Sequence, residues 1–119
     1  MIQKQTYLVP TDKCGVWWVM AFHLYNGFNQ KISYMGRFIK VVVKSTKPNN
    51  RLRKKSKVRS FIMRTRKIFK KLDSSTVLFF YNTSVLLKKR LSPRGKELFG
   101  PILYNIKRKK FINSLSQQI

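Results

Sequence analysis

The 119-residue sequence has almost no acidic side chains. Asp12, Asp73 and Glu97 are its only carboxylates, against 27 Lys and Arg, and the formal net charge is +24. Nothing inside the chain can neutralise this charge, and self-repulsion of that size disfavours a compact state in isolation. The phosphates of a polyanion would replace the missing carboxylates. The charge therefore points to RNA, DNA or an anionic membrane as the partner.

Long apolar runs and cysteines are also scarce. Val16 to Phe22 falls short of the roughly 18 residues that cross a bilayer, and the cations are spread from Lys4 to Lys110 instead of lying on one amphipathic helix. Cys14 is the only cysteine, without the neighbours of a zinc site. The N-terminus has neither the apolar region of a secretory signal nor the character of a transit peptide. We expect no membrane insertion, no metal and no cleaved leader, and the missing signal and disulfides disfavour a secreted membrane-active protein.

Patterns that carry catalysis are missing as well. His23 is the only histidine, and the three acids stand far apart in the sequence. A general base needs a partner within reach. The sequence also lacks HExxH, a P-loop and a dinucleotide-binding glycine pattern. We predict that the protein is not an enzyme and takes no cofactor.

Short β-branched segments predict a fold built mainly of strands. Ile39, Val41 and Val43 fall on one face of a strand over residues 38–44. Four further strands are expected at Val16–Leu24, Val58–Arg64, Val77–Phe80 and Ser84–Leu87. Five or more short strands favour a small closed β-barrel, which leaves no unpaired edge, although a sandwich fits the same pattern.

Turn-forming residues separate the expected strands at Tyr25–Gly27, Pro48–Asn50 and Asp73–Ser75. The end of the chain differs, since a break at Ser92–Gly95 precedes apolar residues at helical spacing. We expect a single domain over residues 1–119. Its barrel covers about residues 1–88, and short C-terminal α-helices cover about residues 92–119.

Cationic residues gather next to the expected strands. The interval from Lys47 to Lys57 carries six cations between two strands, and without phosphate contacts such a loop repels itself. Cations at several strand ends suit recognition of RNA by shape and phosphate rather than by base edges. We predict RNA contacts at Lys40, Lys44, Arg51, Arg53, Lys54, Lys55, Arg64, Arg66, Lys67, Lys70, Lys71, Lys88, Lys89 and Arg90.

Trp17 and Trp18 are adjacent, so on a regular strand they point to opposite faces and at most one belongs to the core. An exposed Trp could stack on a base, fill a pocket on a partner protein, or lie half-buried beside a long cationic side chain. We expect partner contacts at Trp17, Trp18, Phe99 and Pro101.

The chain resembles the L-fourteen family of universal large-subunit ribosomal proteins, through residues that match the family in order along nearly its whole length. Singly these matches are weak, and together, in order and at the family's spacing, they are specific. The first half carries Met1–Gln3, Gln5, Thr6, Leu8, Asp12, Gly15, Met20, Gly27, Gly36–Lys44 and Pro48. The second half carries Arg64, Thr65, Asp73, Ser75, Phe79, Asn82, Val85–Leu87, Phe99–Ile102 and Phe111.

The resemblance implies a five-stranded OB-like β-barrel with a projecting β-ribbon and short C-terminal helices. It implies binding of large-subunit ribosomal RNA near the subunit interface and a bridge to small-subunit ribosomal RNA. Neighbours similar to ribosomal proteins L-three and L-nineteen are implied too, and so is a silencing or assembly factor. The alternative from a different class is a basic DNA-binding or nucleoid protein.

Several positions depart from the family pattern. The family usually has Asp at the position of Arg37, Gly-Asp at Lys55–Ser56, Gly at Ser74 and Arg at Glu97. Loss of acids and glycines with gain of Lys, Asn, Phe, Ile and Tyr is the drift of an AT-rich genome. We therefore expect a mitochondrially encoded ribosomal protein in the mitochondrial matrix, with a plastid or a bacterial cytoplasm as the alternatives.

Overall fold

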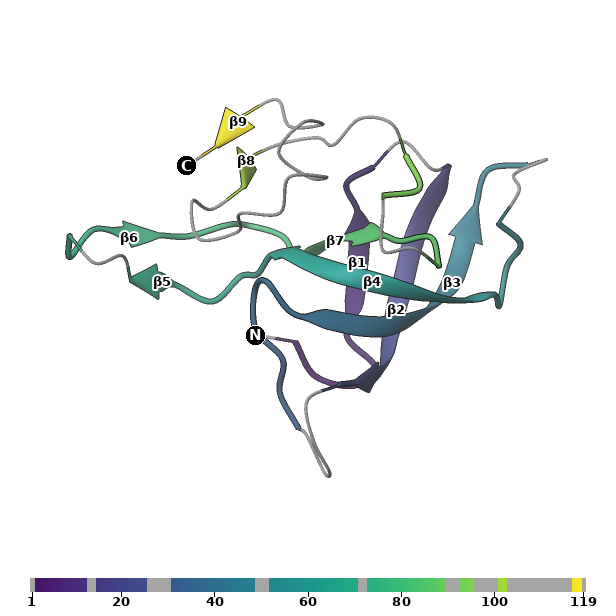
Figure 1. The fold of residues 1–119 in the computed structure, drawn as a ribbon, viewed down its shortest axis with the longest axis horizontal. Helices are drawn as coiled ribbons and strands as arrows, with labels where there is room; N and C mark the ends of the chain where they lie inside the picture. Colours follow the sequence, from purple (N-terminus) through teal and green to yellow (C-terminus); the bar gives the residue numbers. More distant parts are fainter. Residues whose placement is uncertain are drawn as a thin grey trace.

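Five strands of the computed structural model close into a β-barrel (Figure 1). The structure describes residues 2–12, 15–25, 31–48, 52–70, 73–89, 93–95, 101–102 and 117–118. Around the barrel the strands follow the order β1-β2-β3-β4-β7, and β7 completes the circle by pairing in parallel with β1. Their bounds are β1 Tyr7–Pro10, β2 Val16–Leu24, β3 Phe38–Thr46, β4 Lys57–Arg64 and β7 Thr83–Leu86. The predicted closed barrel is confirmed.

The barrel interior is filled by the inward-facing residues of its strands, which alternate most clearly along β3. Ile39, Val41 and Val43 of β3 are fully buried, as their spacing predicts, and they join Val19 of β2 and Ile62 of β4 in the main core cluster. Branched aliphatic side chains suit this role because they pack well on a pleated surface. The positions between them on β3 are only partly buried, and on β4 and β7 the side chains of Phe61, Met63 and Val85 form a second buried cluster with Leu87.

Strand β1 was not among the predicted strands. It has only four residues and ends at Pro10, so its pattern is too short to stand out. Its place is fixed by pairing on both sides, with Leu8 opposite Val19 of the next strand, β2, and Val9 opposite Thr83 of the distant β7. Leu8 points inward and is fully buried.

A two-stranded ribbon extends away from the barrel, to the left in Figure 1. It consists of β5 (Phe69–Lys70) and β6 (Thr76–Val77), which pair antiparallel. The predicted turn at Asp73–Ser75 lies at its tip, where the Ser75 amide and hydroxyl both donate to Asp73 Oδ1, at 3.1 and 2.6 Å. The ribbon expected from the family resemblance is thus present.

The strand predicted at Val77–Phe80 is wrong in its extent. Only Val77 belongs to a strand, and that strand is part of the ribbon and not of the barrel. The backbone bends at Phe80 and Tyr81 before β7 begins, which ends the ladder and leaves both rings exposed.

The end of the chain contributes one described strand pair, in which β8 (Pro101–Ile102) runs parallel to β9 (Gln117–Gln118). The predicted C-terminal helices otherwise lie outside the described residues. Within the part of the chain that the structure describes, no helix has the length and apolar character needed to cross a bilayer.

Candidate nucleic-acid interface

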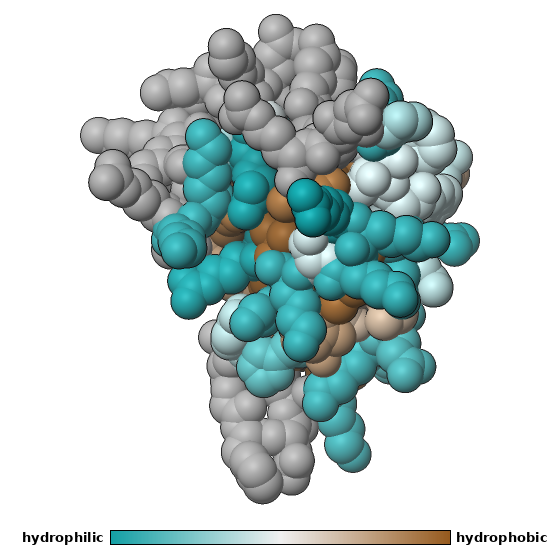
Figure 2. Space-filling view, turned by 90° about the vertical axis from the view of Figure 1, so that its right-hand side faces the viewer, coloured by the Kyte–Doolittle hydropathy of each residue, from teal (hydrophilic) through white to brown (hydrophobic). Residues whose placement is uncertain are grey.

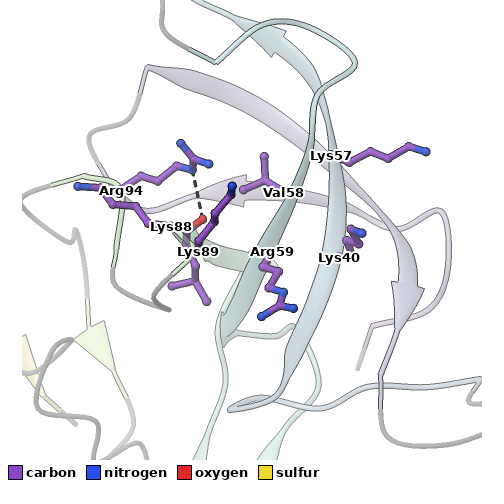
Figure 3. Close-up of a pocket in the computed structure, with 8 residues that line it drawn as sticks. Lys40, Lys57, Val58, Arg59, Lys88, Lys89 and Arg94 are labelled. Atoms are coloured by element: carbon purple, nitrogen blue, oxygen red, sulfur yellow. Dashed lines mark hydrogen bonds between the residues drawn. The ribbon is translucent and has the colours of Figure 1, made fainter.

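Six cationic side chains surround one cavity of about 280 Å3 beside the β4–β7 strand pair. We call this cavity the basic pocket. Figure 3 shows Lys88, Lys89 and Arg94 on one side of it and the β3 and β4 residues on the other. Its described lining residues include no acidic side chain. The six cations are Lys40, Lys57, Arg59, Lys88, Lys89 and Arg94.

The strand register explains why these cations meet. On β4 the side chain of Val58 turns into the core, so Lys57 and Arg59 turn outward. Lys40 of β3 pairs directly with Arg59, which places two like charges across from each other. Such a pair is unfavourable in a sheet unless an anion offsets it.

The third side of the basic pocket comes from the segment after β7. The Leu87 amide donates to the Arg59 carbonyl over 3.0 Å and so carries Lys88 and Lys89 to the edge of β4. Arg94 returns to the same place, because its amide donates to the Leu86 carbonyl at 2.9 Å and its Nε donates to the Leu87 carbonyl at 3.2 Å. The backbone therefore holds the cations together in spite of their repulsion.

The predicted RNA contacts fall in three places. Lys40, Lys88 and Lys89 line the basic pocket. A second group, Lys44, Arg53, Lys54 and Lys55, lies at and beyond the end of β3, in the connection to β4. There the Lys55 amide donates to the Val43 carbonyl at 2.8 Å and Lys55 takes a positive φ of 70°. Figure 2, viewed from the side of this connection, shows hydrophilic side chains over much of this face, around a smaller hydrophobic area.

The third group lies at the far end of β4 and in the ribbon, and comprises Arg64, Arg66, Lys67 and Lys70. Arg64 Nε donates to Thr83 Oγ1 at 2.8 Å. Burial lowers the pKa of the Arg64 guanidinium, because desolvation disfavours the charged form. Lys67 Nζ lies 5.4 Å from the ring centroid of Tyr34. This group and the basic pocket lie at opposite ends of the β4–β7 pair. Arg64 pairs with Thr83 at the start of β7, whereas Ser60, next to Arg59 of the pocket, pairs with Leu86 at the end of β7.

Four of the predicted residues, Arg51, Lys71, Arg90 and Phe99, lie outside the described residues, and of Pro101 only the backbone strand is described. In the opposite direction, the sequence prediction missed Lys57, Arg59 and Arg94 as members of one site. The signal available for Arg59 was its outward position beside Val58 on a predicted strand. Arg94 lies within the predicted break at Ser92–Gly95, where no hydrophobic period indicates which way a side chain points.

Trp17 and Trp18 are both about half exposed, at 52% and 49%. The prediction that the pair would point to opposite faces assumed a regular strand. Instead, β2 shifts register between Val16 and Trp18 and again between Trp18 and Val19. These irregularities break the alternation, so Val16 and Val19 are buried and the two rings between them stay outside.

The described residues thus form a closed β-barrel with a strongly basic surface, and they contain no group of three or more His, Cys, Asp or Glu that could hold a metal ion. The family model for ribosomal protein L14p/L23e matches residues 1–119. The chain is also 50% identical, over all 119 residues and the full length of both chains, to the large ribosomal subunit protein uL14m of Tetrahymena pyriformis.

The chain belongs to the L14p/L23e family of ribosomal proteins and is a mitochondrial member of it. Members of this family are structural constituents of the ribosome. The family resemblance and the mitochondrial location expected from the sequence are confirmed.

Proposed function

We propose that the protein binds the large-subunit ribosomal RNA of the mitochondrial ribosome through the basic pocket. The supporting observation is that six cations line one cavity and that no acidic residue lies among its described lining residues. RNA phosphate would offset the like charges of the Lys40–Arg59 pair. The role is structural, and no chemical step is assigned to any residue.

The cations of the β3–β4 connection and of the ribbon extend this surface along the barrel. Arg53 and Lys54 are exposed at one end, and Arg66 and Lys70 are exposed at the other. Long cationic side chains spread over a rigid barrel can follow the phosphates of a folded RNA without reading its bases. This arrangement supports recognition by shape.

The family resemblance extends the proposal to the position in the ribosome. The barrel sits at the subunit interface, contributes an intersubunit bridge to small-subunit ribosomal RNA, and has neighbours similar to L-three and L-nineteen. A silencing or assembly factor docks on it as in relatives. Crosslinks from this chain to small-subunit RNA in intact mitochondrial ribosomes test the bridge, and their absence would contradict it.

The salt dependence of RNA binding tests the basic pocket. Replacing Arg59, Lys88 and Lys89 by Ala should lower the affinity for a large-subunit RNA fragment. The slope of log K against log salt should become shallower by about 0.7 to 0.9 for each phosphate that the variant no longer binds.

A matched variant removes the same charge elsewhere, at exposed cations that do not line the pocket: Lys4, Lys31 and Arg37. It should change the slope less. Equal slopes for the two triple variants would mean that net charge alone drives binding and that the pocket has no special role. Equal affinity for duplex DNA, with no sedimentation with ribosomal particles, would favour the nucleoid protein instead.

A further inference from the structure

A second hollow lies at the other end of the β4–β7 strand pair, where Arg64 is opposite Thr83. Its volume is about 460 Å3, and the described residues that line it are all different from those of the basic pocket. We call it the aromatic groove. Four aromatic rings, one cation and one amide side chain line it: Tyr7, Trp18, Phe80, Tyr81, Arg66 and Asn82.

The rings are exposed because of how the strands run. On β1 the buried Leu8 turns inward, so Tyr7 turns outward beside β2, where the register shifts keep Trp18 outside. The bend before β7 turns the other two rings outward, and Phe80 is 81% exposed and Tyr81 69%. Four rings that could have entered a core are therefore presented together to solvent.

The backbone under the groove is tied together by Asn82. Its carbonyl accepts a hydrogen bond from the Val9 amide at 3.1 Å, and its side-chain Oδ1 accepts one from the Arg66 amide at 2.9 Å. Strand β1, the end of β4 and the start of β7 thus meet at one residue. A site that is already formed loses less conformational entropy when it binds a ligand.

The charge beside the rings is positive. Arg66 lines the groove itself, and Arg64 lines an adjoining cavity of about 290 Å3 that shares Tyr81 with it. Among the residues that the structure describes, no carboxylate lines either hollow. The occupant should therefore combine flat apolar groups with negative charge, which is the chemistry of single-stranded RNA. Its bases stack on aromatic faces and its phosphates bind Arg.

We propose that the aromatic groove holds unpaired RNA bases, stacked on Trp18, Phe80 and Tyr81, with the adjoining phosphates on Arg66 and Arg64. The inference rests on the proposed function in one respect, that the partner is RNA. It adds a different mode of recognition, since the basic pocket takes backbone phosphates and the groove takes bases that have left a helix. A base-paired helix keeps its bases stacked internally and cannot use the groove.

Tryptophan fluorescence of the full-length chain provides the test. Trp17 and Trp18 are the only two tryptophans, so the variant Trp17→Phe leaves Trp18 as the sole reporter. Three probes are compared: a single-stranded RNA of about eight nucleotides, an abasic strand of the same length, and an RNA duplex. Stacking should quench Trp18 with the base-bearing single strand and not with the other two.

Phe80→Ala and Tyr81→Ala, at exposed positions, should each lower the affinity for the single strand by about 5-fold or more, with the abasic strand and the duplex unaffected. Equal affinity for the base-bearing and abasic strands, or unchanged affinity in both variants, would overturn the proposal. Loss of a neighbouring protein from ribosomes carrying both substitutions, with unchanged RNA reactivity, would assign the groove to a protein and also overturn it.

The basic-pocket variant of Arg59, Lys88 and Lys89 separates the two proposals. It should weaken binding of all three probes and leave the quenching at saturation intact. If it has no effect while quenching persists, the proposed role of the basic pocket fails and the groove stands. If pocket binding holds and quenching is absent, only the groove fails.

Discussion

The Asp12 carboxylate accepts a hydrogen bond from the backbone amide of Gly95, with Oδ2 and N 3.0 Å apart. The two residues lie 83 positions apart, and both are buried. This contact fastens the segment that carries Arg94 to the start of the barrel. One of the three acids in the chain is thus used inside the fold, at a backbone donor.

Replacing Asp12 by Ala should destabilise the protein by about 1 to 3 kcal/mol, because a buried amide then loses its acceptor. The free energy of unfolding from urea titration measures this loss. Asp73→Ala is the control, since Asp73 is exposed at the ribbon tip and should cost less. Equal losses in the two variants would contradict the structural role of Asp12.

Replacing Lys55 by Gly should stabilise the β3–β4 connection. Lys55 has a φ of 70°, in the left-handed region that is costly for residues with a Cβ. The gain should be about 0.5 to 1 kcal/mol, measured as a rise in the urea midpoint, because part of the relief is offset by the greater freedom of Gly in the unfolded chain.

Lys54→Gly is the matched control, since it removes the same charge one residue earlier and Lys54 is not among the residues with positive φ. It should give no gain. Ser74, with a φ of 71° at the ribbon tip, should respond to Gly in the same direction as Lys55. A loss of stability in both Lys55→Gly and Ser74→Gly would contradict the expected relief of backbone strain at these turns.

Replacing Lys40 by Met should stabilise the free protein and weaken its binding to RNA. The substitution removes the like-charge pair with Arg59, which should gain about 0.2 to 1 kcal/mol at low salt and less at high salt. Unfolding at two salt concentrations and RNA titration measure the two effects. If stability and affinity both fall, the Lys40 side chain stabilises the barrel by more than its repulsion with Arg59 costs.

Inorganic phosphate should raise the unfolding midpoint of the wild-type chain. A ligand that binds only the folded state stabilises it by RT ln(1 + [L]/Kd), which is about 2.7 kcal/mol at a hundredfold excess over Kd. Thermal unfolding in phosphate and in chloride at equal ionic strength gives the comparison. The Arg59, Lys88 and Lys89 triple variant should lose most of the difference, and an undiminished effect would place the phosphate elsewhere.

The barrel could be predicted where one strand carries its own pattern. Val41 and Val43 alternate with less buried residues, and the sequence pattern predicts their buried face correctly. The β1 strand was missed because it has only four residues and because one of its two partners, β7, lies far along the chain. The strand prediction at Val77–Phe80 was wrong beyond Val77, because apolar content alone does not distinguish a paired strand from a loop with exposed aromatic rings such as Phe80.

The basic pocket was only partly predictable for a related reason. Charge density picked out Lys88 and Lys89, which stand together in the sequence. It could not show that Arg59 lies opposite Lys40, because that depends on the register between two strands. The exposure of Trp17 and Trp18 also depends on register, because the pairing of β2 with β3 shifts on both sides of Trp18. No residue type in this segment signals such a shift.

The pairing of β7 with β1 also sets the order in which the molecule can take shape as it is made. The Thr11 hydroxyl donates to the Ser84 carbonyl at 3.2 Å across 73 positions of chain. This contact, and the closed barrel, can form only after Ser84 and the rest of β7 have been synthesised. Contacts so distant in sequence are also slow to form in a finished chain. During that interval the nascent chain is cationic and open along one side, and any nearby polyanion can bind it before the barrel closes.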